Sequence, residues 1–403
     1  MSAPPWTTPA QIRSQLRRRW DDGSSLAARL SGETVFPLSL NVRAPNAAAL
    51  AAQFDEARRW IRALEEGARP ALGYGYDIVW RDINHRQLGR NRLPEKIVLP
   101  SAEDALRLLG RLADARRFDA LAAATLAAFP SLRDWLGRRQ LTLLEQAAAW
   151  PRTLSIMQWF VAHPRPGLYL RQLDIAGVDS KFIETRKGLL AELLDQVLPA
   201  DAIDADASGV RQFEARYGLL GKPALIRFRM LDPAAHIGGL SDLTVPVAQF
   251  ARLFPSVRHV FITENEVNGL AFPETPASMV IFGGGYAVER LLDIAWLNDK
   301  DVIYWGDIDT HGFAILDRLR AALPYARTIL MDRLTLLEHR LLWGCEDADK
   351  RFVGTLQRLT DEESGLFAML RDNELGECVR MEQERLGYHW VTQAIMVAIE
   401  KSQ

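Results

Sequence analysis

Two aspartates one residue apart, Asp307 and Asp309, stand in the segment WGDIDTHGF, directly after an apolar run that ends at Trp305. Side chains two residues apart in an extended chain point to the same side, so both carboxylates can reach one point. Crowded carboxylates raise each other's pKa unless a cation lies between them. Because hard cations prefer oxygen ligands, this spacing favours an Mg²⁺ or Mn²⁺ site that holds a phosphate group.

Other apolar runs of the same region also end in residues suited to a site. Glu264 follows VFIT, the glycines 283–285 follow VIF, and Asp332 follows TILM. From about residue 245 such runs alternate with helical patterns, which is typical of a parallel sheet covered on both faces. Sites in these sheets form beyond the carboxyl ends of the strands, and neighbouring strands lie about 4.8 Å apart. We therefore expect Glu264 beside the aspartate pair.

Each of these residues also has a structural interpretation. Asp307 could cap the following helix while Asp309 is a solvated loop acid, but a third acid and a triple glycine at neighbouring strand ends favour the metal site. His311 is either a phosphate contact or proton donor to the leaving oxygen, or only a helix-start residue. Glu382 and Glu384, in RMEQERLG, are interpreted as a solvated or ion-paired helix face.

The bulk composition is that of an ordinary globular protein. The 403 residues, enough for two or three domains, carry 49 Lys and Arg against 51 Asp and Glu, so net charge neither requires nor excludes a polyanionic partner. The two cysteines, Cys345 and Cys378, form no CxxC motif, which argues against a disulfide framework or a zinc ribbon. With no signal-peptide pattern and no membrane-length apolar stretch, we expect a cytoplasmic protein.

The first 105 residues predict a compact α+β unit. The pattern indicates a basic amphipathic helix over 8–30, a strand over 36–42, a second helix over 47–66 and a strand over 74–83. Residues 106–159 are mainly helical, and their aromatics Trp135, Trp150 and Trp159 are interpreted as packing residues.

A basic strand is expected after the helical region. FEARYGLLGKPALIRFRMLD, residues 213–232, predicts a helix, a turn and a strand on which Arg227 and Arg229 share one face. Helices followed by a basic strand resemble a winged helix, a frequent duplex-binding unit. Candidates for contacts with DNA phosphates are Arg171 and Lys181 in this region, together with Arg227 and Arg229; such contacts are salt-sensitive and poor in base readout.

Longer phrases carry a resemblance to a known family. A strand ending in glutamate, a glycine-bearing strand and a later strand ending in DxD resemble the Toprim pattern of topoisomerases, primases and several nucleases. TENEVNGLAF, FGGGY, YWGDIDTHGFAIL and LMDRLTLL are similar to the JetD-type nuclease subunits of the Wadjet anti-plasmid systems. The upstream PLSLNV, WRDINHRQLGRNRLPE, HPRPGLYLRQLDIAGVDSKFIE and RFRMLD are similar to the amino-terminal region of that family, so the resemblance spans most of the chain.

The resemblance implies an α/β architecture like the A subunit of type IIB topoisomerases. An N-terminal α+β and helical arm at residues 1–105 would precede a helical, winged-helix-like DNA-binding region at 106–244 and a Toprim-type, mainly parallel catalytic domain at 245–403. It also implies a homodimer that cleaves circular double-stranded DNA together with a condensin-like SMC complex, its kleisin and its accessory subunits. Asp307 and Asp309 match the DxD that binds Mg²⁺ or Mn²⁺, and Glu264 matches the Toprim glutamate, as metal ligand or general acid/base.

One departure from the topoisomerase pattern points to hydrolysis. Those enzymes cut with a tyrosine in an arginine-plus-paired-tyrosine motif, whereas Tyr169 and Tyr217 stand alone and Tyr169 reads as a strand-face packing residue. Without a phosphotyrosine to preserve the bond energy, metal-assisted hydrolysis is the simplest chemistry.

Three other readings stay open. The segment from Asp307 to Thr310 also satisfies DxDxT, the nucleophile motif of haloacid-dehalogenase-like phosphatases, although it lies late in the chain and no GDxxND-like segment follows. A DNA-binding scaffold with a degenerate Toprim fold is the second reading, and a strand-passing topoisomerase subunit is the third.

Overall fold

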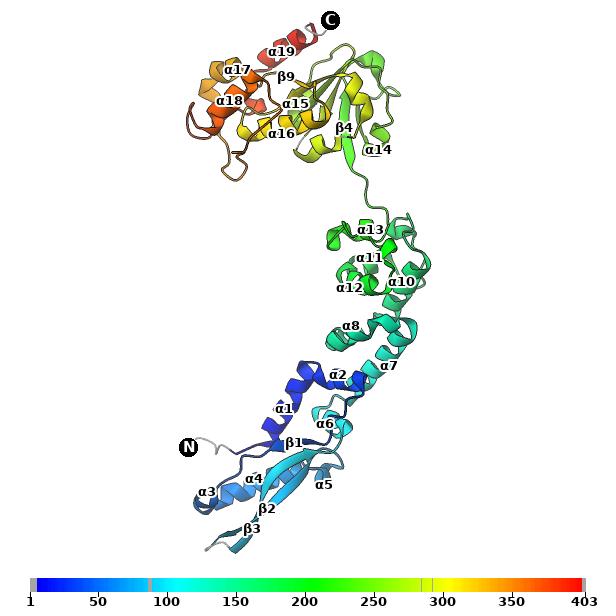
Figure 1. The fold of residues 1–403 in the computed structure, drawn as a ribbon, viewed down its shortest axis with the longest axis vertical. Helices are drawn as coiled ribbons and strands as arrows, with labels where there is room; N and C mark the ends of the chain where they lie inside the picture. Colours follow the sequence, from blue (N-terminus) through cyan, green and yellow to red (C-terminus); the bar gives the residue numbers. More distant parts are fainter. Residues whose placement is uncertain (1–5, 86–88, 284, 292, 401–403) are drawn as a thin grey trace. The chain divides into compact units, whose positions relative to one another are not determined.

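The computed structural model describes residues 6–85, 89–283, 285–291 and 293–400. The chain forms two compact units, unit 1 at residues 1–221 and unit 2 at residues 222–403 (Figure 1). Each unit combines helices with strands, so the α/β class is confirmed at that level. Gly284 of the triple glycine and residues 86–88 of the N-terminal segment that carries the resemblance lie outside the described residues.

Unit 1 begins with helices, continues with a small sheet and ends in a helical region. Its elements are α1 (Pro9–Asp21), α2 (Ser24–Ser31), β1 (Leu38–Asn41), α3 (Ala47–Ala52), α4 (Phe54–Glu66), α5 (Arg69–Leu72), β2 (Asp77–His85), β3 (Gly89–Leu99), α6 (Ala102–Leu109), α7 (Leu112–Ala128), η1 (Pro130–Leu132), α8 (Arg133–Arg138), α9 (Gln140–Glu145), α10 (Trp150–Ala162), η2 (Leu170–Gln172), α11 (Ser180–Glu184), α12 (Lys187–Val197), η3 (Ala200–Ala202), η4 (Val210–Gln212) and α13 (Phe213–Arg216).

The amino-terminal helix predicted over 8–30 is two helices. Thr8 caps α1 by accepting a hydrogen bond from Gln11 N at 3.2 Å, and the buried side chains of α1 recur every four residues, at Ile12, Leu16 and Trp20. The helix stops before Gly23, whose φ of 78° suits glycine and not a continuing helix. The antiparallel sheet β1-β3-β2 follows, and α4 packs on it (Figure 1).

The helical region from α6 to α13 has an aromatic core. Trp135 and Trp150 are buried and their rings stack at 5.6 Å, while Trp150 Nε1 donates to Thr125 Oγ1 at 2.8 Å. The packing role predicted for these tryptophans is confirmed. Trp159 is half-buried and stacks on His163 at 4.4 Å. Tyr169, in contrast, is 44% exposed, so the prediction of a packing residue there is wrong.

The strand expected to complete a winged helix lies in unit 2. All of residues 100–221 are described, and they form helices and turns, with an isolated bridge between Tyr169 and Leu220 but no strand. The strand that carries Arg227 and Arg229 pairs instead with two strands of the unit 2 sheet. The division between the units consequently falls after Gly221 and not after residue 244.

Unit 2 is built around one six-stranded sheet and a short two-stranded ladder. Its elements are β4 (Leu225–Met230), η5 (Pro233–Ala235), β5 (Asp242–Pro246), α14 (Val247–Phe250), β6 (His259–Thr263), α15 (Glu266–Ala271), β7 (Ser278–Phe282), η6 (Gly285–Leu291), η7 (Ala295–Asp299), β8 (Asp301–Trp305), α16 (Thr310–Ala322), β9 (Arg327–Thr328), α17 (Arg333–Glu338), η8 (Arg340–Leu342), β10 (Gly344–Cys345), α18 (Asp361–Arg371), β11 (Val379–Arg380), η9 (Gln383–Arg385) and α19 (Tyr388–Glu400).

The sheet order is β5-β4-β7-β6-β8-β9. The strands β7, β6, β8 and β9 are parallel, as the alternating pattern predicts, and every residue of β6 is buried. The hairpin β4–β5 adds an antiparallel edge, so the sheet is mixed. The helical pattern between β7 and β8 folds as the 3₁₀ turns η6 and η7. No helix within the described ranges is long and apolar enough to cross a membrane.

Candidate active site

Glu264 and the aspartate pair follow the carboxyl ends of two neighbouring parallel strands, β6 and β8, at the same edge of the sheet. The register of β6 and β8 sets Thr263 opposite Trp305, so the next residues, Glu264 and Gly306, lie side by side. This close approach requires glycine, because a Cβ at Gly306 would lie 2.5 Å from Glu264 Oε1 and 2.6 Å from Tyr304 Oη. The structure therefore places Glu264 beside the segment that carries both aspartates.

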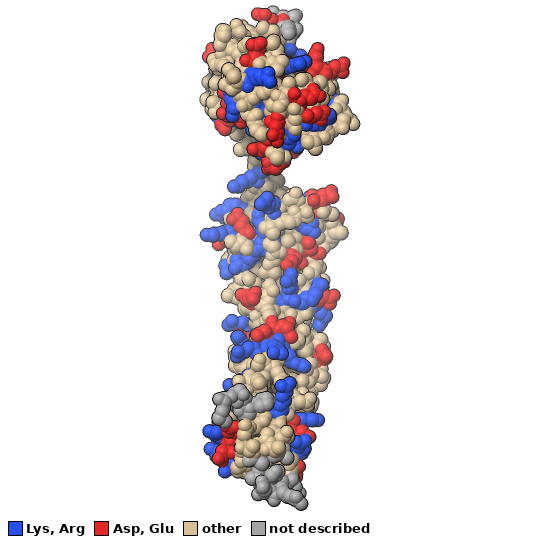
Figure 2. Space-filling view, turned by 90° about the vertical axis from the view of Figure 1, so that its left-hand side faces the viewer, with Lys and Arg blue, Asp and Glu red and all other residues tan. Residues whose placement is uncertain are grey.

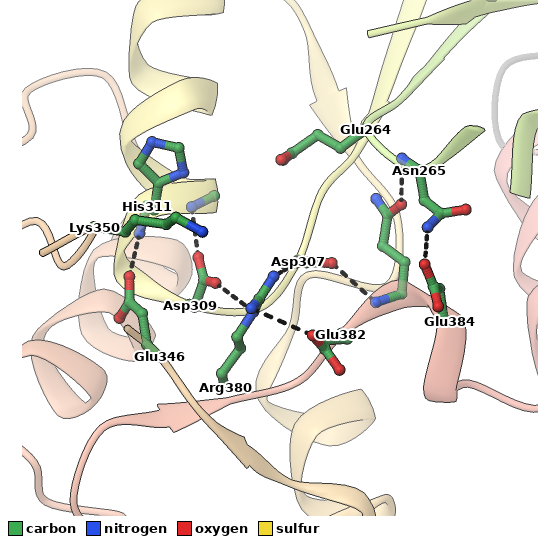
Figure 3. Close-up of polar contacts among 12 residues, drawn as sticks. Glu264, Asn265, Asp307, Asp309, His311, Glu346, Lys350, Arg380, Glu382 and Glu384 are labelled. Carbon is green, nitrogen blue, oxygen red and sulfur yellow. Dashed lines mark hydrogen bonds and ion pairs between the residues drawn. The ribbon is translucent and has the colours of Figure 1, made fainter. Parts of the chain in front are cut away.

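A short antiparallel bridge brings a distant segment to the aspartates. Ile308 and Met381 exchange backbone hydrogen bonds of 2.9 and 3.0 Å, and both side chains are buried. Side chains alternate along extended chains, so the neighbours of these two residues project to the opposite side. Asp307, Asp309 and Arg380 consequently share one face (Figure 3).

Arg380 is the centre of a group of ion pairs. Its Nη2 lies 2.6 Å from Asp307 Oδ2, its Nε 3.1 Å from Asp309 Oδ2 and its Nη1 3.3 Å from Glu382 Oε1 (Figure 3). Burial opposes the charge on this guanidinium, but the carboxylates, Asp307 foremost, outweigh it and hold the pKa of Arg380 above its ordinary value. The guanidinium of Arg380 thus forms ion pairs with three carboxylates.

The helix cap at this point is Asp309 and not Asp307. Asp309 Oδ1 accepts a hydrogen bond from Gly312 N at 2.7 Å at the start of α16, and the residue is only 4% exposed, so it is not a solvated loop acid. Asp307 Oδ1 accepts from the backbone N–H of Gln383 at 2.9 Å. In each aspartate one oxygen is held by the backbone and the other faces Arg380.

Glu346, a residue that sequence reasoning missed, adds another buried carboxylate. Its oxygens accept hydrogen bonds from Thr310 Oγ1 at 2.7 and 2.8 Å and from the backbone N–H of His311 at 3.0 Å. Two acids, Glu346 and Asp309, therefore meet the amino-terminal end of α16, where the partial positive charge of the helix favours them.

These side chains line one small cavity of about 40 Å³. Its lining consists of Glu264, Asp307, Asp309, His311, Glu346, Asp347, Lys350 and Arg380. Five carboxylates face two basic side chains, so the lining carries an excess of negative charge. Arg351 also pairs with one of these carboxylates, with its Nε 3.8 Å from Glu346 Oε2, and the carboxylates still outnumber the basic side chains.

Burial perturbs the pKa of the groups in this cavity. Burial raises the pKa of Glu264 to about 7; the charges of Asp307 and Asp309 add to the rise, and the hydrogen bond from Tyr304 opposes it. Burial likewise raises the pKa of Asp309 to about 7, against the hydrogen bond from the Gly312 N–H. For His311, burial lowers the pKa, so the imidazole is predominantly neutral at pH 7. The carboxyl groups of Glu264 and Asp309 therefore both titrate near neutral pH.

Gln383 connects the two strand ends to the distant segment. Its Oε1 accepts hydrogen bonds from Thr263 Oγ1 and Asn265 N, both at 3.1 Å, and its Nε2 donates to the carbonyl of Trp305. This buried side chain fixes β6, β8 and the segment that carries Arg380 relative to one another. No local sequence signal marks Gln383, because the partners of its side chain lie 78 to 120 residues away.

The donor chemistry of the site suits a hard divalent cation, but the present arrangement is built around a guanidinium. Within the described part of the chain, no three His, Cys, Asp or Glu side chains are positioned to hold a metal ion together. Carboxylate oxygens of Asp307 and Asp309 nevertheless converge, and Arg380 lies between them. The residues fit Mg²⁺ or Mn²⁺ in type and charge.

Two of the four basic residues predicted to contact DNA lie on unit 1, and the other two lie on unit 2. Arg171 and Lys181 are exposed on unit 1. On unit 2, Arg227 forms two hydrogen bonds to Asp242, at 2.9 and 2.7 Å, and another to Glu266. Arg229 donates to backbone carbonyls of α15, at 2.8 Å for the first of them. These two arginines are already engaged within the chain.

Charge is unevenly distributed between the units. Residues 1–221 carry 30 Lys and Arg against 25 Asp and Glu, whereas residues 222–403 carry 19 against 26. On the face drawn in Figure 2, basic side chains gather in several groups on unit 1. The unit with the carboxylate cavity is acidic, and the other unit is basic.

The remaining predicted acids have structural partners. Asp332 caps α17, accepting from Thr335 N at 2.8 Å. Glu382 pairs with Arg380 and, at 2.8 Å, with Arg385, which agrees with an ion-paired face, although it precedes a 3₁₀ turn and not a helix. Glu384 accepts a hydrogen bond from the side chain of Asn265.

Two family models match the chain. Residues 9–195 match a model described as "Uncharacterized protein conserved in bacteria N-term" (DUF3322), and residues 218–395 match one described as "Wadjet protein JetD, C-terminal". No curated protein matches. The second match includes every residue of the candidate site, and together the two matches span most of both units. The chain therefore belongs to the JetD-like family of Wadjet subunits.

Proposed function

We propose that this chain is a divalent-metal-dependent DNA endonuclease that hydrolyses circular plasmid DNA within a condensin-like Wadjet complex. Membership of the family indicates a role in Wadjet defence. One observation carries the nuclease proposal: carboxylates from two adjacent parallel strands, Glu264 on one and Asp307 and Asp309 on the other, line a single cavity with an excess of negative charge. Unit 2 would then be a Toprim-type domain.

Asp307 and Asp309 would hold Mg²⁺ or Mn²⁺, with Glu264 as a further ligand or as the acid/base. When bound, the metal supplies an activated water and neutralises charge on the phosphate. The excess of carboxylates in the cavity supports this assignment, since crowded carboxylates are stabilised by a cation.

Glu264 is suited to move a proton. In the metal-free protein the pKa of Glu264 is raised to about 7, so the carboxyl group is present in both protonation states near neutral pH, as an effective general acid or base requires. The Tyr304 hydroxyl donates to Glu264 Oε1 and leaves Oε2 to accept a proton from water or return one to the leaving oxygen. Gly306 keeps the space that this carboxylate needs.

His311 and Lys350 provide polar contacts of different character on the cavity wall. Neutral His311 can donate a hydrogen bond to a phosphate oxygen or to the leaving oxygen. Lys350 supplies a positive charge that attracts the phosphodiester without base preference.

Unit 1 supplies the rest of the DNA contact in this proposal. Its surplus of basic residues includes the exposed Arg171 and Lys181, and contacts of this kind make binding salt-dependent and independent of base sequence. Recognition of circular DNA would come from the condensin-like SMC complex, with its kleisin and accessory subunits, acting on a homodimer of this chain.

The proposal is tested by plasmid cleavage with Mn²⁺ or Mg²⁺, with and without the partner complex. We expect cleavage by the wild type, loss of cleavage in Asp307→Ala and Glu264→Ala with DNA binding retained, and no loss in Glu274→Ala, which removes an exposed carboxylate of unit 2. Metal-independent cleavage, or full activity of Asp307→Ala, would refute the assignment.

The same purified protein also distinguishes the nuclease from the phosphatase and topoisomerase hypotheses. Turnover of an aryl phosphate without DNA cleavage would favour the phosphatase reading of DxDxT. A covalent protein–DNA adduct trapped during the reaction would favour a topoisomerase, and Tyr169 would be the residue to substitute, because Tyr217 is buried and hydrogen-bonded to Asp195 at 2.7 Å.

A further inference from the structure

Arg380 lies in the position that a cation shared by Asp307 and Asp309 would take. The two aspartates turn one oxygen each toward it, and Glu382 closes a third side. Their other oxygens are fixed by the backbone N–H groups of Gly312 and Gln383. A divalent ion shared by these two aspartate oxygens would have to take the place of the guanidinium between them.

The guanidinium of Arg380 is incompletely satisfied. Its Nε is buried and, although 3.1 Å from Asp309 Oδ2, has no hydrogen-bond partner. Arg320, a structural arginine of the same unit, differs: its Nε donates to Ala326 O at 2.9 Å, and both Nη atoms donate to Glu363. A buried donor without a partner costs free energy. Arg380 is therefore held by charge and not by a full set of hydrogen bonds.

The side chain of Arg380 also reaches solvent. It is 27% exposed, whereas the backbone of this segment is fixed by the ladder to Gly344 and by the bridge between Met381 and Ile308. Displacement of the guanidinium would therefore need a rotation of this side chain, without a change in the backbone hydrogen bonds that orient the aspartates.

We infer that Arg380 is a built-in competitor of the divalent metal, a counterion that holds Asp307 and Asp309 together until the metal displaces it. The inference rests on the metal site of the proposed function and adds its regulation: the carboxylates stay paired and ordered without metal, and the free protein binds metal more weakly than its carboxylates alone would allow. The displaced guanidinium remains at the cavity, where a phosphate is its natural partner.

The test is direct measurement of Mn²⁺ binding, by electron paramagnetic resonance and calorimetry, on the full chain without DNA. Arg380→Gln keeps the approximate size and removes the charge. We expect Mn²⁺ to bind this variant about tenfold more tightly than the wild type, within the roughly 5- to 150-fold typical of two coupled sites. Arg380→Lys should fall between the two. Arg385→Gln, a matched loss of a guanidinium that pairs with Glu382 and Leu342 O instead, should bind as the wild type does.

A second measurement uses the unmutated chain and does not depend on whether a variant folds. Phenylglyoxal modifies accessible guanidinium groups, and peptide mass spectrometry reports each arginine separately. Mn²⁺ should raise the modification rate of Arg380 severalfold and leave that of Arg385 unchanged.

The outcomes separate this inference from the proposed function. Equal or weaker Mn²⁺ binding by Arg380→Gln, or modification of Arg380 that Mn²⁺ does not raise, overturns the competitor role while leaving a metal site that Asp307→Asn abolishes. Absence of Asp307-dependent Mn²⁺ binding in both the wild type and Arg380→Gln overturns the metal site itself and the competitor role with it.

Discussion

Replacing Glu264 with glutamine should change how the stability of the metal-free protein depends on pH. The pKa of Glu264 rises from 4.5 to about 7 on folding, so between these values the folded state binds a proton that the unfolded state does not. Stability from this group is complete below pH 4.5 and is lost as pH rises through 7. Glu264→Gln keeps an oxygen acceptor for Tyr304 and removes the ionisation.

The magnitude follows from the size of the pKa change. One unit of difference between folded and unfolded pKa corresponds to about 1.4 kcal/mol, so the full rise is worth about 3 kcal/mol. Because the Glu264 side chain keeps some exposure, solvent screening reduces this, and we expect about 2 kcal/mol. In EDTA, Glu264→Gln should therefore match the wild type near pH 4.5 and exceed its unfolding free energy by about 2 kcal/mol at pH 8.

Urea unfolding at pH 4.5, 6, 7 and 8, with Glu274→Gln as an exposed-carboxylate control, measures this difference. Parallel pH profiles for the wild type and Glu264→Gln would refute the reasoning, because the carboxyl would then not be destabilised by ionisation in the folded state. Adding Mn²⁺ at pH 8 should restore more stability to the wild type than to the variant, since only the wild type gains a neutralised carboxylate.

Three further substitutions test the packing of the site and its support. Gly306→Ala should abolish plasmid cleavage and cost roughly 1–3 kcal/mol in urea unfolding, because its Cβ would lie 2.5 Å from Glu264 Oε1; an active variant would contradict that contact. Gln383→Leu should cost about 1–3 kcal/mol and weaken Mn²⁺ binding in calorimetry, since it leaves buried polar groups of both strand ends unpaired; unchanged stability would argue against that connecting role. Arg320→Ala should cost roughly 3–5 kcal/mol by leaving Glu363 buried and uncompensated, and a thermal midpoint equal to that of the wild type would show that the pair is dispensable.

The parts of the structure that local pattern determines could be predicted. Apolar runs mark β6, β7 and β8, and acids directly after two of these strands mark the edge where the cavity forms. The register of β6 and β8 then determines the position of the site. Because Thr263 pairs with Trp305 in these parallel strands, the next residues, Glu264 and Gly306, lie side by side. The convergence of Glu264 with Asp307 and Asp309 on one cavity could be anticipated for the same reason.

The parts of the structure that depend on contacts between distant segments could not be predicted from the sequence. β4 alternates as a strand, but only its pairing with β7 shows which unit it belongs to. Arg380 lies 73 residues beyond Asp307, and its role arises from a bridge between two short segments with no helical or strand signal of their own. Glu346 similarly follows a two-residue strand. Such residues have no signature until the chain is folded.

The bridge between Ile308 and Met381 also bears on how the protein is made. A ribosome releases Glu264, Asp307 and Asp309 well before it reaches the segment with Arg380 and Gln383, which holds the strand ends in place. A partly synthesised or proteolytically cut chain therefore displays acids without the scaffold that orders them. Only polypeptide translated past this late segment can assemble the centre, so if the chain is the proposed nuclease, its shorter fragments would lack an ordered active site.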